Sequence, residues 1–514
     1  MSPVMAPARS RFAGRRLSFA RIALTLVAAL AVAGAGAAAT VVPVLATPAP
    51  APGADRWFAG YYDVTLDSEE QLARSTMAEG PGGVVLAFVV AAGNDDCTPT
   101  WGKAYTLDDA ASRFQLDRRV ERLRREGRPL AVSFGGAINT ELAAACSTVD
   151  ALTRAYRLVL DRYDIDVVDL DIEGDALRDT AATTRRAAAI AQLQQERAEA
   201  GRPLDVWLTL PVAPDGLTED GLGQIASILN AGVPLAGVNA MTMNFNTDDR
   251  SVSQAELSIG ALRATATQIE TVWKDRKLPL PAGGAWSLLG ATPMIGQNDV
   301  EHEVFSLDDA HALAAFADEV GLERMSLWSV NRDRTCGTNY PHPHTVSVSC
   351  SGVEQAGETF SDVLGAGREG TPSGRVAPED DSPVIADDPE KSPFPVWSSQ
   401  SFYSAGVFVV WHGSVYVSKW WNEDGAVPDD PTLDAAASAW TYVGPVLPDD
   451  KPYALPQLPA GTYPEWVAGE LYNQGDRVMY DGSGYEAKWW SRGQRPDRSV
   501  TDRDYSPWKL VTEP

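Results

Sequence analysis

The sequence predicts an α/β fold, a closed (β/α)₈ (TIM) barrel followed by two small all-β modules. Three observations support this prediction. Between residues 55 and 365, apolar runs of strand length alternate with longer amphipathic stretches. Residues 366–395 then change abruptly to a composition rich in Pro, Gly, Asp and Glu. Beyond that segment an aromatic pattern occurs twice, with the second copy 69 positions after the first.

The apolar runs of residues 55–365 number eight, which is the strand count of a (β/α)₈ barrel. Strands that alternate with helices pair in parallel through right-handed crossovers, and eight of them close most simply into a barrel. The stretches between them, for example residues 141–163, place apolar side chains near one helical face. An open doubly wound sheet is the alternative. The candidate strands are Trp57–Thr65, Gly83–Ala91, Leu130–Gly136, Val167–Gly174, Val206–Val212, Gly237–Phe245, Ala291–Asn298 and Met325–Asn331.

Residues 1–46 have the pattern of a targeting segment. Five arginines lie between residues 9 and 21, an apolar stretch follows from Ile22 to Ala46, and Val44-Leu45-Ala46 offers a small-residue cleavage site. The apolar stretch is also long enough to span a bilayer, so a cleaved signal peptide and an uncleaved signal anchor are both open. Either predicts that the rest of the chain is exported, to be secreted or held at the cell surface.

The cysteines and histidines do not suggest a metal site. There are four cysteines without a Cys-x-x-Cys spacing, and the five histidines do not cluster with them. In an exported chain an even number of cysteines favours disulfides. We expect Cys97–Cys146 and Cys336–Cys350 among the three possible connectivities, and we expect neither a metal nor another cofactor.

The net charge limits the classes of molecule that the protein is expected to bind. With 69 acidic and 43 basic residues the formal charge is −26, which would be repelled by phosphate backbones and anionic lipid headgroups. Nucleic acid is therefore not an expected partner, whereas a neutral or a cationic polymer is compatible with this charge.

The C-terminal part divides into two copies of one module. Residues 366–395 form an acidic Pro/Gly-rich linker that cannot bury enough apolar surface to fold, and residues 447–464, with five prolines, form a second linker. The modules span residues 396–446 and 465–514. The first copy contains Trp397, Tyr403, Gly406, Tyr416, Lys419, Trp420 and Trp421, which recur as Trp466, Tyr472, Gly475, Tyr485, Lys488, Trp489 and Trp490.

Modules of about 50 residues have marginal cores and cannot bury all of these aromatic rings. Adjacent residues on a strand face opposite ways, so one tryptophan of each pair is expected in the core and the other at the surface. The alternative is that both are buried. Exposed aromatic rings on so small a module indicate an interaction site, because indole faces bury large area at low entropic cost.

The run from Asp166 to Glu173 carries the clearest chemical signal. On a strand, Asp169, Asp171 and Glu173 share one face, and Val168, Leu170 and Ile172 share the other. Inside a barrel these carboxylates repel one another and lose hydration, so some hold protons near neutral pH, as a general acid must. A solvent-facing acidic edge and a magnesium site are the alternatives for this run.

Two motifs resemble those of the family 18 glycoside hydrolases, the chitinase family. Asp166-x-x-Asp169-x-Asp171-x-Glu173 matches the signature DxxDxDxE, and Ser133-Phe-Gly-Gly matches the SxGG motif of the third strand. Trp328, in MSLWSVNRD, resembles the tryptophan platform beneath the reacting sugar. The resemblance covers about 310 residues, those of the predicted barrel.

The resemblance implies a retaining, substrate-assisted hydrolysis of chitin and of N-acetylglucosamine oligomers. Glu173 would be the proton donor, Asp171 would orient the acetamido N–H, and Asp169 would tune Asp171 by sharing a proton. The absence of a long insertion between the seventh and eighth predicted strands suggests an open cleft and endo action. Nothing in the resemblance requires a protein partner, so a monomer is expected.

The sixth predicted strand departs from the family pattern. Relatives often carry Met-x-Tyr-Asp, whereas this chain has Met241-Thr-Met243-Asn244. We place Met243 and Asn244 among the substrate-binding residues with Trp328, with Met243 alternatively a packing residue. Gln297 is a candidate substitute contact with substrate, and capping of a loop is the alternative.

The repeated modules resemble the family 5/12 carbohydrate-binding modules, which bind chitin. The second copy is the closer match, since the first has Gly406-Val407 where the pattern has Gly-Asp. The resemblance suggests chitin contacts through Tyr403, Trp420, Trp421, Tyr472, Trp489 and Trp490.

Two other functions stay open from the sequence. A chitin-binding, lectin-like protein would explain the changes at Met243 and Asn244. An endo-N-acetylglucosaminidase acting on another N-acetylglucosamine glycoside would use the same barrel chemistry.

Overall fold

The computed structural model describes residues 56–372 and 387–513, apart from 67–76, 78–79, 81, 248, 339, 341–344 and 423–424. The predicted targeting segment 1–46 lies outside the described residues, as do residues 373–386 of the predicted linker 366–395. Among the helices within these ranges, none has the length and apolar character needed to cross a bilayer.

Eight parallel strands close into a ring. The hydrogen-bonded order is β1-β13-β10-β9-β7-β6-β5-β2, and β2 pairs with β1 to complete the circle. The predicted closed barrel is confirmed, because an open doubly wound sheet would leave two unpaired edges. The strands are β1 (Trp57–Asp63), β2 (Gly83–Gly93), β5 (Leu130–Gly135), β6 (Val167–Asp171), β7 (Asp205–Ala213), β9 (Gly237–Met241), β10 (Leu289–Ala291) and β13 (Arg324–Met325).

Several barrel strands are shorter than the apolar runs predicted. The sixth strand ends at Met241 and the eighth at Met325. The seventh, Leu289–Ala291, ends where the predicted run Ala291–Asn298 begins, so that prediction is wrong for all but its first residue. Within the loop after β10, β11 (Gly296–Gln297) pairs with β12 (Val304–Phe305) as a separate antiparallel ribbon. Apolar loop residues that pack over the barrel end have the same sequence pattern as strand residues, so periodicity does not separate the two.

Three further strands extend the ring and were not predicted. β3 (Asp96–Trp101) and β4 (Tyr105–Thr106) continue the sheet beyond β2, and β8 (Gly216–Leu217) pairs with the end of β7.

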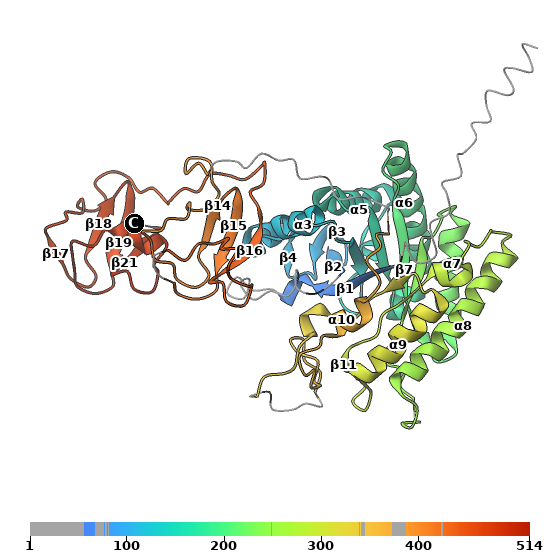
Figure 1. The fold of residues 1–514 in the computed structure, drawn as a ribbon. Coiled ribbons are helices and arrows are strands. Elements are labelled where there is room, and N and C mark those ends of the chain that lie inside the picture. Colours follow the sequence, from blue (N-terminus) through green and yellow to red (C-terminus); the bar gives the residue numbers. More distant parts are fainter. Residues whose placement is uncertain are drawn as a thin grey trace, which may run out of the picture. The chain divides into compact units, whose positions relative to one another are not determined.

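Helices surround the ring of strands (Figure 1). Ser/Thr caps start several of them: Ser253 and Ser306 each accept from the backbone N–H three residues on, and Glu256 and Asp309 bond back to the cap. The helices are α2 (Leu107–Phe114), α3 (Leu116–Arg125), α4 (Leu142–Ala145), α5 (Val149–Tyr163), α6 (Thr180–Glu199), α7 (Glu219–Asn230), α8 (Gln254–Asp275), α9 (Leu307–Val320) and α10 (Phe360–Gly365).

The alternation along β6 separates an apolar and an acidic face. Val168, Leu170 and Ile172 belong to the main core, which lies between the strands and the helices. Asp169 and Asp171 point the other way, into the barrel. The inward positions elsewhere hold a smaller apolar cluster, which includes Trp57, Tyr61 and Trp207. The predicted assignment of faces is therefore confirmed.

The two C-terminal modules each contain an antiparallel three-stranded sheet. In the first, β14 (Phe408–Trp411), β15 (Ser414–Ser418) and β16 (Trp440–Pro445) pair in sequence order. In the second, β18 (Arg477–Tyr480), β19 (Ser483–Ala487) and β21 (Trp508–Val511) do so, and β17 (Leu471–Tyr472) pairs with β20 (Ser491–Arg492). Equivalent residues build both cores: Tyr403, Val409 and Trp440 in one, and Tyr472, Val478 and Trp508 in the other.

The disulfides are those predicted. Cys97–Cys146 ties β3 to the end of α4 across 49 residues, and Cys336–Cys350 closes a segment of 14 residues. All four cysteines of the chain are thereby paired.

The two disulfides should differ in their effect on stability. On the chain-entropy model, replacing both Cys97 and Cys146 by Ala should lower the free energy of unfolding of the barrel by about 4 kcal/mol, and the same change at Cys336 and Cys350 by about 3 kcal/mol. The order follows from the longer loop that the first bridge closes. Urea unfolding of the two double variants measures the difference, and a larger loss at Cys336–Cys350 would contradict the entropic account.

Candidate active site

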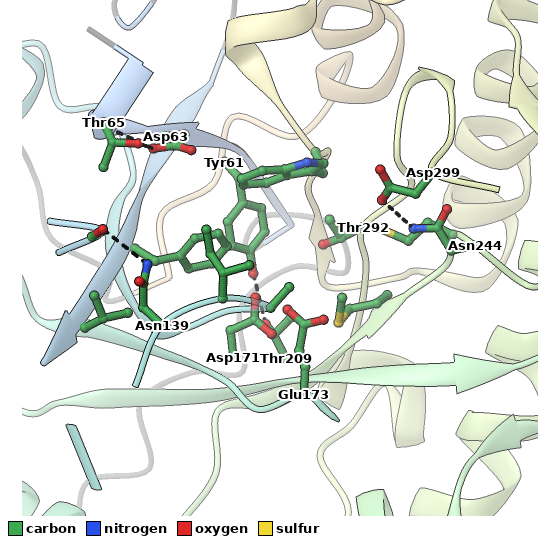
Figure 2. Close-up of a pocket in the computed structure, with 18 residues that line it drawn as sticks. Tyr61, Asp63, Thr65, Asn139, Asp171, Glu173, Thr209, Asn244, Thr292 and Asp299 are labelled. Carbon is green, nitrogen blue, oxygen red and sulfur yellow. Dashed lines mark hydrogen bonds between the residues drawn. The ribbon is translucent and has the colours of Figure 1, made fainter. Parts of the chain in front are cut away.

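A pocket of about 300 Å³ lies at the carboxyl ends of the barrel strands. Parallel barrels place their chemistry at this end, because the loops that follow all the strands meet there. Its polar lining comes from segments far apart in the sequence. Several of these groups are labelled in Figure 2, among them Tyr61, Asp171, Glu173, Thr209, Asn244 and Asp299.

β5 and β6 approach each other closely at the base of this pocket. Gly135 has a φ of +113°, and a Cβ atom there would lie 2.0 Å from the carbonyl oxygen of Asp171. The backbone N–H of Gly136 donates to that same carbonyl at 3.1 Å. Only glycine combines this backbone conformation with such a contact. The Gly-Gly pair after Ser133 therefore serves to bring β5 against the strand that carries the carboxylates.

Glu173 stands just beyond the end of β6 and lines the pocket. Its backbone is still extended, which keeps its side chain on the same face as Asp171. Burial and, to a smaller extent, the negative charge of Asp299 together raise the pKa of Glu173 to about 7. The carboxyl group is therefore about half protonated near neutral pH, which suits a group that must donate and then accept a proton.

Asp171 lies deeper in the same pocket and is almost completely buried. Burial raises its pKa well above the ordinary value, and the neighbouring charges of Glu173 and Asp169 add to the effect. Its Oδ1 atom is buried without a hydrogen-bond partner in the described structure. A buried polar atom of this kind is available to a ligand that enters the pocket.

Asp169 is fully buried below the pocket and accepts four hydrogen bonds. Tyr61 Oη at 2.8 Å and Ser133 Oγ at 2.7 Å donate to Oδ2. Thr209 Oγ1 and Arg324 Nη1, both at 2.7 Å, donate to Oδ1. Asp169 therefore supports the site from below, while Asp171 and Glu173 face the cavity.

Tyr61, Thr209 and Arg324 were missed by the sequence analysis. The strand alternation could have found two of them, because Tyr61 lies two residues from Ala59 on the inward face of β1, and Thr209 two residues from Trp207 on β7. For Arg324 the available signal was a charged residue directly before the apolar run Met325–Trp328.

Asp166, the first acidic residue of the signature, is not part of the pocket. It precedes β6 at the opposite end of the strand and pairs with Arg197 at 3.0 Å and Arg202 at 2.7 Å. Its role is to anchor the start of the strand to the end of α6 and the turn that follows.

Met243 and Asn244 both line the pocket, as predicted for substrate-binding residues. Asn244 Nδ2 donates to Asp299 Oδ2 at 3.1 Å, the bond drawn in Figure 2. The backbone N–H of Asn244 donates to Asn298 Oδ1 at 3.2 Å, so both ends of the residue are tied to the loop after β10. This loop thereby carries Asp299 to within electrostatic range of Glu173.

Gln297 does not reach the pocket. It is buried, and its Nε2 donates to the backbone carbonyls of Asn298, Glu301 and Glu303 at 3.1, 2.9 and 3.2 Å. The substrate contact predicted for Gln297 is therefore wrong, and the alternative, capping of its own loop, is what the structure shows. Hydrophobic periodicity does not indicate which side of an irregular loop faces the pocket.

Trp328 provides an apolar wall of the pocket. It stacks on Phe88 with ring centroids 5.3 Å apart and meets Tyr61 edge-on at 6.2 Å. Phe88, from β2, was not predicted. Together they form a flat aromatic surface next to the carboxyl groups, the kind of surface on which an apolar sugar face stacks.

In the part of the chain that the structure describes, no group of three or more His, Cys, Asp or Glu side chains is placed to hold a metal ion. The acidic run of β6 is divided between the pocket and the hydrogen bonds beneath it. The magnesium alternative for this run thus finds no ligand cluster there.

The tryptophan pairs of the two modules are exposed at both positions. Their exposed fractions are 45% and 37% for Trp420 and Trp421, and 42% and 68% for Trp489 and Trp490. The expectation that one of each pair joins the core is wrong, because Trp440 and Trp508 already fill the module cores. Lys419 and Lys488 lie over the rings of Trp420 and Trp489, at 5.7 and 4.6 Å.

Tyr403 and Tyr472, which the sequence grouped with these tryptophans, are instead core residues. Their exposed fractions are 1% and 6%, and their hydroxyl groups accept from the backbone N–H groups of Ser398 and Val467 at 2.7 Å. They have no ring face available for stacking on a ligand.

Residues 465–509 match the family model for carbohydrate-binding module family 5/12. This is the second module, the one in which the exposed pair is Trp489 and Trp490. The first module has the same sheet order and the equivalent core.

The barrel region is similar to two curated proteins. It is 34% identical over 292 residues to the "Probable bifunctional chitinase/lysozyme" of Escherichia coli K12, covering 55% of this chain and 31% of that protein. It is 32% identical over 286 residues to "Endochitinase 11" of Metarhizium anisopliae, covering 54% of this chain and 52% of that protein. The matches thus span about a third and about half of the length of these relatives.

Solved structures share the barrel fold. The catalytic domain of a hyperthermophilic chitinase from Pyrococcus furiosus has 27% identity and a TM-score of 0.50, covering 64% of this chain and 98% of that one. Catalytic site mutants of active domain 2 of the chitinase from the same organism have 26% identity and a TM-score of 0.50 with the same coverage.

The raised pKa of Glu173 predicts how stability depends on pH. Its ordinary value is 4.5 and its folded value about 7, so ionisation is less favourable in the folded barrel than in the unfolded chain. The barrel should lose up to about 3 kcal/mol of stability as the pH rises from 4.5 through 7. Glu173→Gln should remove this loss, and the variant should be the more stable protein at pH 8 but not at pH 4.

Urea unfolding of both proteins between pH 4 and pH 8 measures the effect. Curves of unfolding free energy that run parallel across this range would contradict the raised pKa.

Proposed function

We propose that the protein is a chitinase that hydrolyses β-1,4 bonds between N-acetylglucosamine units by a retaining, substrate-assisted mechanism. The observation that carries this proposal is the pairing of Glu173, with a pKa near 7, and buried Asp171 beside the Phe88–Trp328 surface. The similarity to chitinases in the barrel region and the carbohydrate-binding family match support the choice of substrate.

In the proposed reaction the protonated carboxyl of Glu173 donates its proton to the glycosidic oxygen as the bond to the anomeric carbon breaks. The carbonyl oxygen of the substrate's own 2-acetamido group attacks that carbon, which forms a cyclic oxazolinium ion. Asp171 accepts the acetamido N–H and stabilises the positive charge on the ring. Water then attacks the anomeric carbon, and Glu173, now ionised, takes its proton, which restores the enzyme and leaves the configuration retained.

This mechanism explains why hydrolysis needs only one carboxyl group as the acid, and no second carboxylate as nucleophile. A two-carboxylate retaining enzyme needs a second carboxylate as nucleophile, about 5 Å from the acid. Here Asp169 is fully buried and occupied by four donors, so it is not available for attack. The substrate must bring its own nucleophile, which restricts turnover to sugars with an N-acetyl group at carbon 2.

Met243 and Asn244 replace the tyrosine and aspartate expected at the sixth strand. The amide of Asn244 supplies a donor in the pocket, and its bond to Asp299 holds it in place. We assign Asn244 to the substrate acetamide or a neighbouring hydroxyl, and Met243 to packing beside it.

We further propose that the enzyme is endo-acting and monomeric, and that residues 1–46 direct it to secretion or anchor it at the cell surface.

The modules are proposed as chitin anchors. Both present two adjacent exposed indoles next to a lysine, and chitin offers flat, apolar pyranose faces on which such rings stack. Two weak sites on one chain increase the residence of the barrel on an insoluble surface. For the first module, the proposal of chitin binding rests on its sheet and its exposed tryptophans, which match those of the second module.

Glu173→Gln should abolish most of the turnover of soluble N-acetylglucosamine oligomers. Loss of a general acid lowers kcat by about 10²–10⁴-fold, while KM should change little because the pocket keeps its shape. Asp205→Asn is a matched control, since burial and the charge of Asp166 raise the pKa of Asp205 to about 6 at the other end of the barrel, and its turnover should equal that of the wild type.

A wild type that binds the oligomers without cleaving them would refute the chitinase proposal in favour of a lectin-like protein. Cleavage of N-glycan cores with no cleavage of chitin oligomers would instead indicate an endo-N-acetylglucosaminidase.

Replacing both Trp489 and Trp490 by Ala should weaken binding to insoluble chitin by about 10–100-fold, because two stacking rings contribute about 1–3 kcal/mol. Turnover of soluble oligomers should not change. Replacing Trp420 and Trp421 tests the first module in the same way. A pull-down on chitin beads beside an oligomer assay gives both readings, and an equal loss in the two assays would mean that the tryptophans are structural.

A further inference from the structure

The side chains that line the candidate active site carry carboxyl groups and no cation. No lysine, arginine or histidine lines the pocket that the structure describes, and its titratable groups are Tyr61, Asp63, Asp171, Glu173 and Asp299. Asp171 Oδ1 is buried there without a hydrogen-bond partner, open to a ligand. Such a pocket attracts a cation and repels an anion, because its apolar walls focus the field of the carboxylates. In the mechanism above, Asp299 does no more than hold Asn244.

Asp299 lies at the exposed rim of this pocket, in the loop after β10. Hydrogen bonds fix the loop on both sides of it. Asn298 is buried, and its Oδ1 accepts from the backbone N–H of Asn244 at 3.2 Å. Glu303 is also buried, and it accepts from the backbone N–H groups of the two residues after Asn244, at 2.9 and 2.6 Å. The carboxylate of Asp299 is therefore held in place before any ligand arrives.

This carboxylate keeps its charge available on the pocket side. Its Oδ2 accepts from the neutral amide of Asn244 at 3.1 Å, the bond drawn in Figure 2. Within the described residues Asp299 has no ion-pair partner. Arg332 is attracted to Asp299, but it is buried, donates to the backbone carbonyl of Gln297 and does not line the pocket. A cationic ligand in the pocket can thus pair with Asp299 without displacing a protein cation.

The place of Asp299 along a bound sugar chain follows from the group that its charge affects. Its charge adds to the effect of burial on the pKa of Glu173. The pKa of Asp171 is raised by burial and by carboxylates other than Asp299. In the mechanism Glu173 contacts the glycosidic oxygen, and Asp171 the acetamido group of the reacting sugar. Asp299, beside Glu173 but away from Asp171, therefore faces the sugar on the other side of that oxygen.

The group at carbon 2 of this neighbouring sugar decides whether a charge meets Asp299. In chitin it is a neutral amide, whereas in a deacetylated unit it is a primary amine, which is protonated at acidic pH. An ammonium group pairs with a carboxylate, and such a pair at an exposed rim changes binding by about 2–5-fold. The net charge of −26 acts in the same direction at longer range. A sugar that carries a carboxylate, such as N-acetylmuramic acid, is repelled.

We propose that Asp299 is a specificity-determining residue that pairs with a protonated glucosamine unit next to the reacting sugar, so that partly deacetylated chitin is a substrate of this site. The reacting unit itself must keep its N-acetyl group, because that group is the nucleophile. The inference rests on the proposed function for the reaction, but the charge preference can be measured by binding alone.

The first test compares kcat/KM at pH 5 on two tetramers. One is fully acetylated N-acetylglucosamine, and the other has a single glucosamine unit beside the cleaved bond. Asp299→Asn keeps the acceptor for Asn244 but removes the charge, so it should lower the rate on the glucosamine tetramer by about 2–5-fold more than the rate on the acetylated one. An effect on Glu173 applies to both substrates and cancels in this ratio. Equal losses on both tetramers would overturn the proposal.

Exchange of the two side chains provides a rescue. Asn244→Asp combined with Asp299→Asn moves the carboxylate to the other partner of the same hydrogen bond. Residue 244 has a φ of +53°, a conformation that Asp tolerates as Asn does. The exchange variant should regain most of the wild-type ratio, and 1 M NaCl should reduce that ratio in both proteins by screening the pair. A ratio that stays at the level of Asp299→Asn would contradict a role for the charge.

Glu301 offers a matched control in the same loop. It is also exposed, two positions beyond Asp299, and it does not line the pocket. Glu301→Gln removes the same charge from the protein and should keep the wild-type ratio. A reduction as large as that in Asp299→Asn would show that the overall charge, and not Asp299, selects the substrate.

Binding to Glu173→Gln separates this proposal from the proposed function. Calorimetry with the two tetramers should show that adding Asp299→Asn weakens binding of the glucosamine tetramer by about 2–5-fold relative to the acetylated one. A tetramer of alternating N-acetylglucosamine and N-acetylmuramic acid should bind more weakly than either. No change in the relative affinities, or a preference for the anionic tetramer, would overturn the proposal. Failure of the wild type to cleave the acetylated tetramer would refute the proposed function and leave this comparison intact.

Discussion

Repulsion among three carboxyl groups on one strand is the constraint around which the barrel interior is organised. The period of two along β6 brings Asp169, Asp171 and Glu173 onto the inward face, where little water remains to stabilise their charges. The lowest group is compensated by Arg324 and three hydroxyl donors. The upper two face the pocket, and burial raises the pKa of both carboxyl groups, that of Glu173 to about 7, which suits an acid catalyst.

Closure of the ring makes this compensation possible. Arg324, Tyr61, Ser133 and Thr209 come from four different strands, and only a closed barrel points all of them at one carboxylate. The glycine pair after Ser133 brings β5 within hydrogen-bond distance of β6, and Asn244 ties the end of the sixth strand to the loop that carries Asp299. The four donors to Asp169 thus form one hydrogen-bonded network, whereas Asp171 Oδ1 in the pocket is buried without a partner.

The modules follow a different principle, since a core of about 50 residues has room for few large side chains. Trp440 and Tyr403 in one copy, and Trp508 and Tyr472 in the other, occupy that core. The adjacent tryptophan pairs are then left outside, and their indoles form a flat apolar surface that suits the faces of a polysaccharide. Barrel and modules thus both expose aromatic surfaces, the barrel beside carboxyl groups and the modules beside a lysine.

The sequence by itself determined the features that repeat locally. The eight apolar runs predicted the barrel, the alternation along Asp169–Glu173 predicted the inward carboxyl groups, and the 69-residue repeat predicted two modules of one kind. Tertiary structure alone decided which groups meet across the barrel. Arg324 lies 155 positions from Asp169, and Asp299 lies 55 from Asn244, and no periodicity records such pairs. Tertiary structure also decided which side chains are buried. Gln297 is held by the backbone carbonyls of its own loop, and both tryptophans of each pair are exposed because Trp440 and Trp508 occupy the module cores.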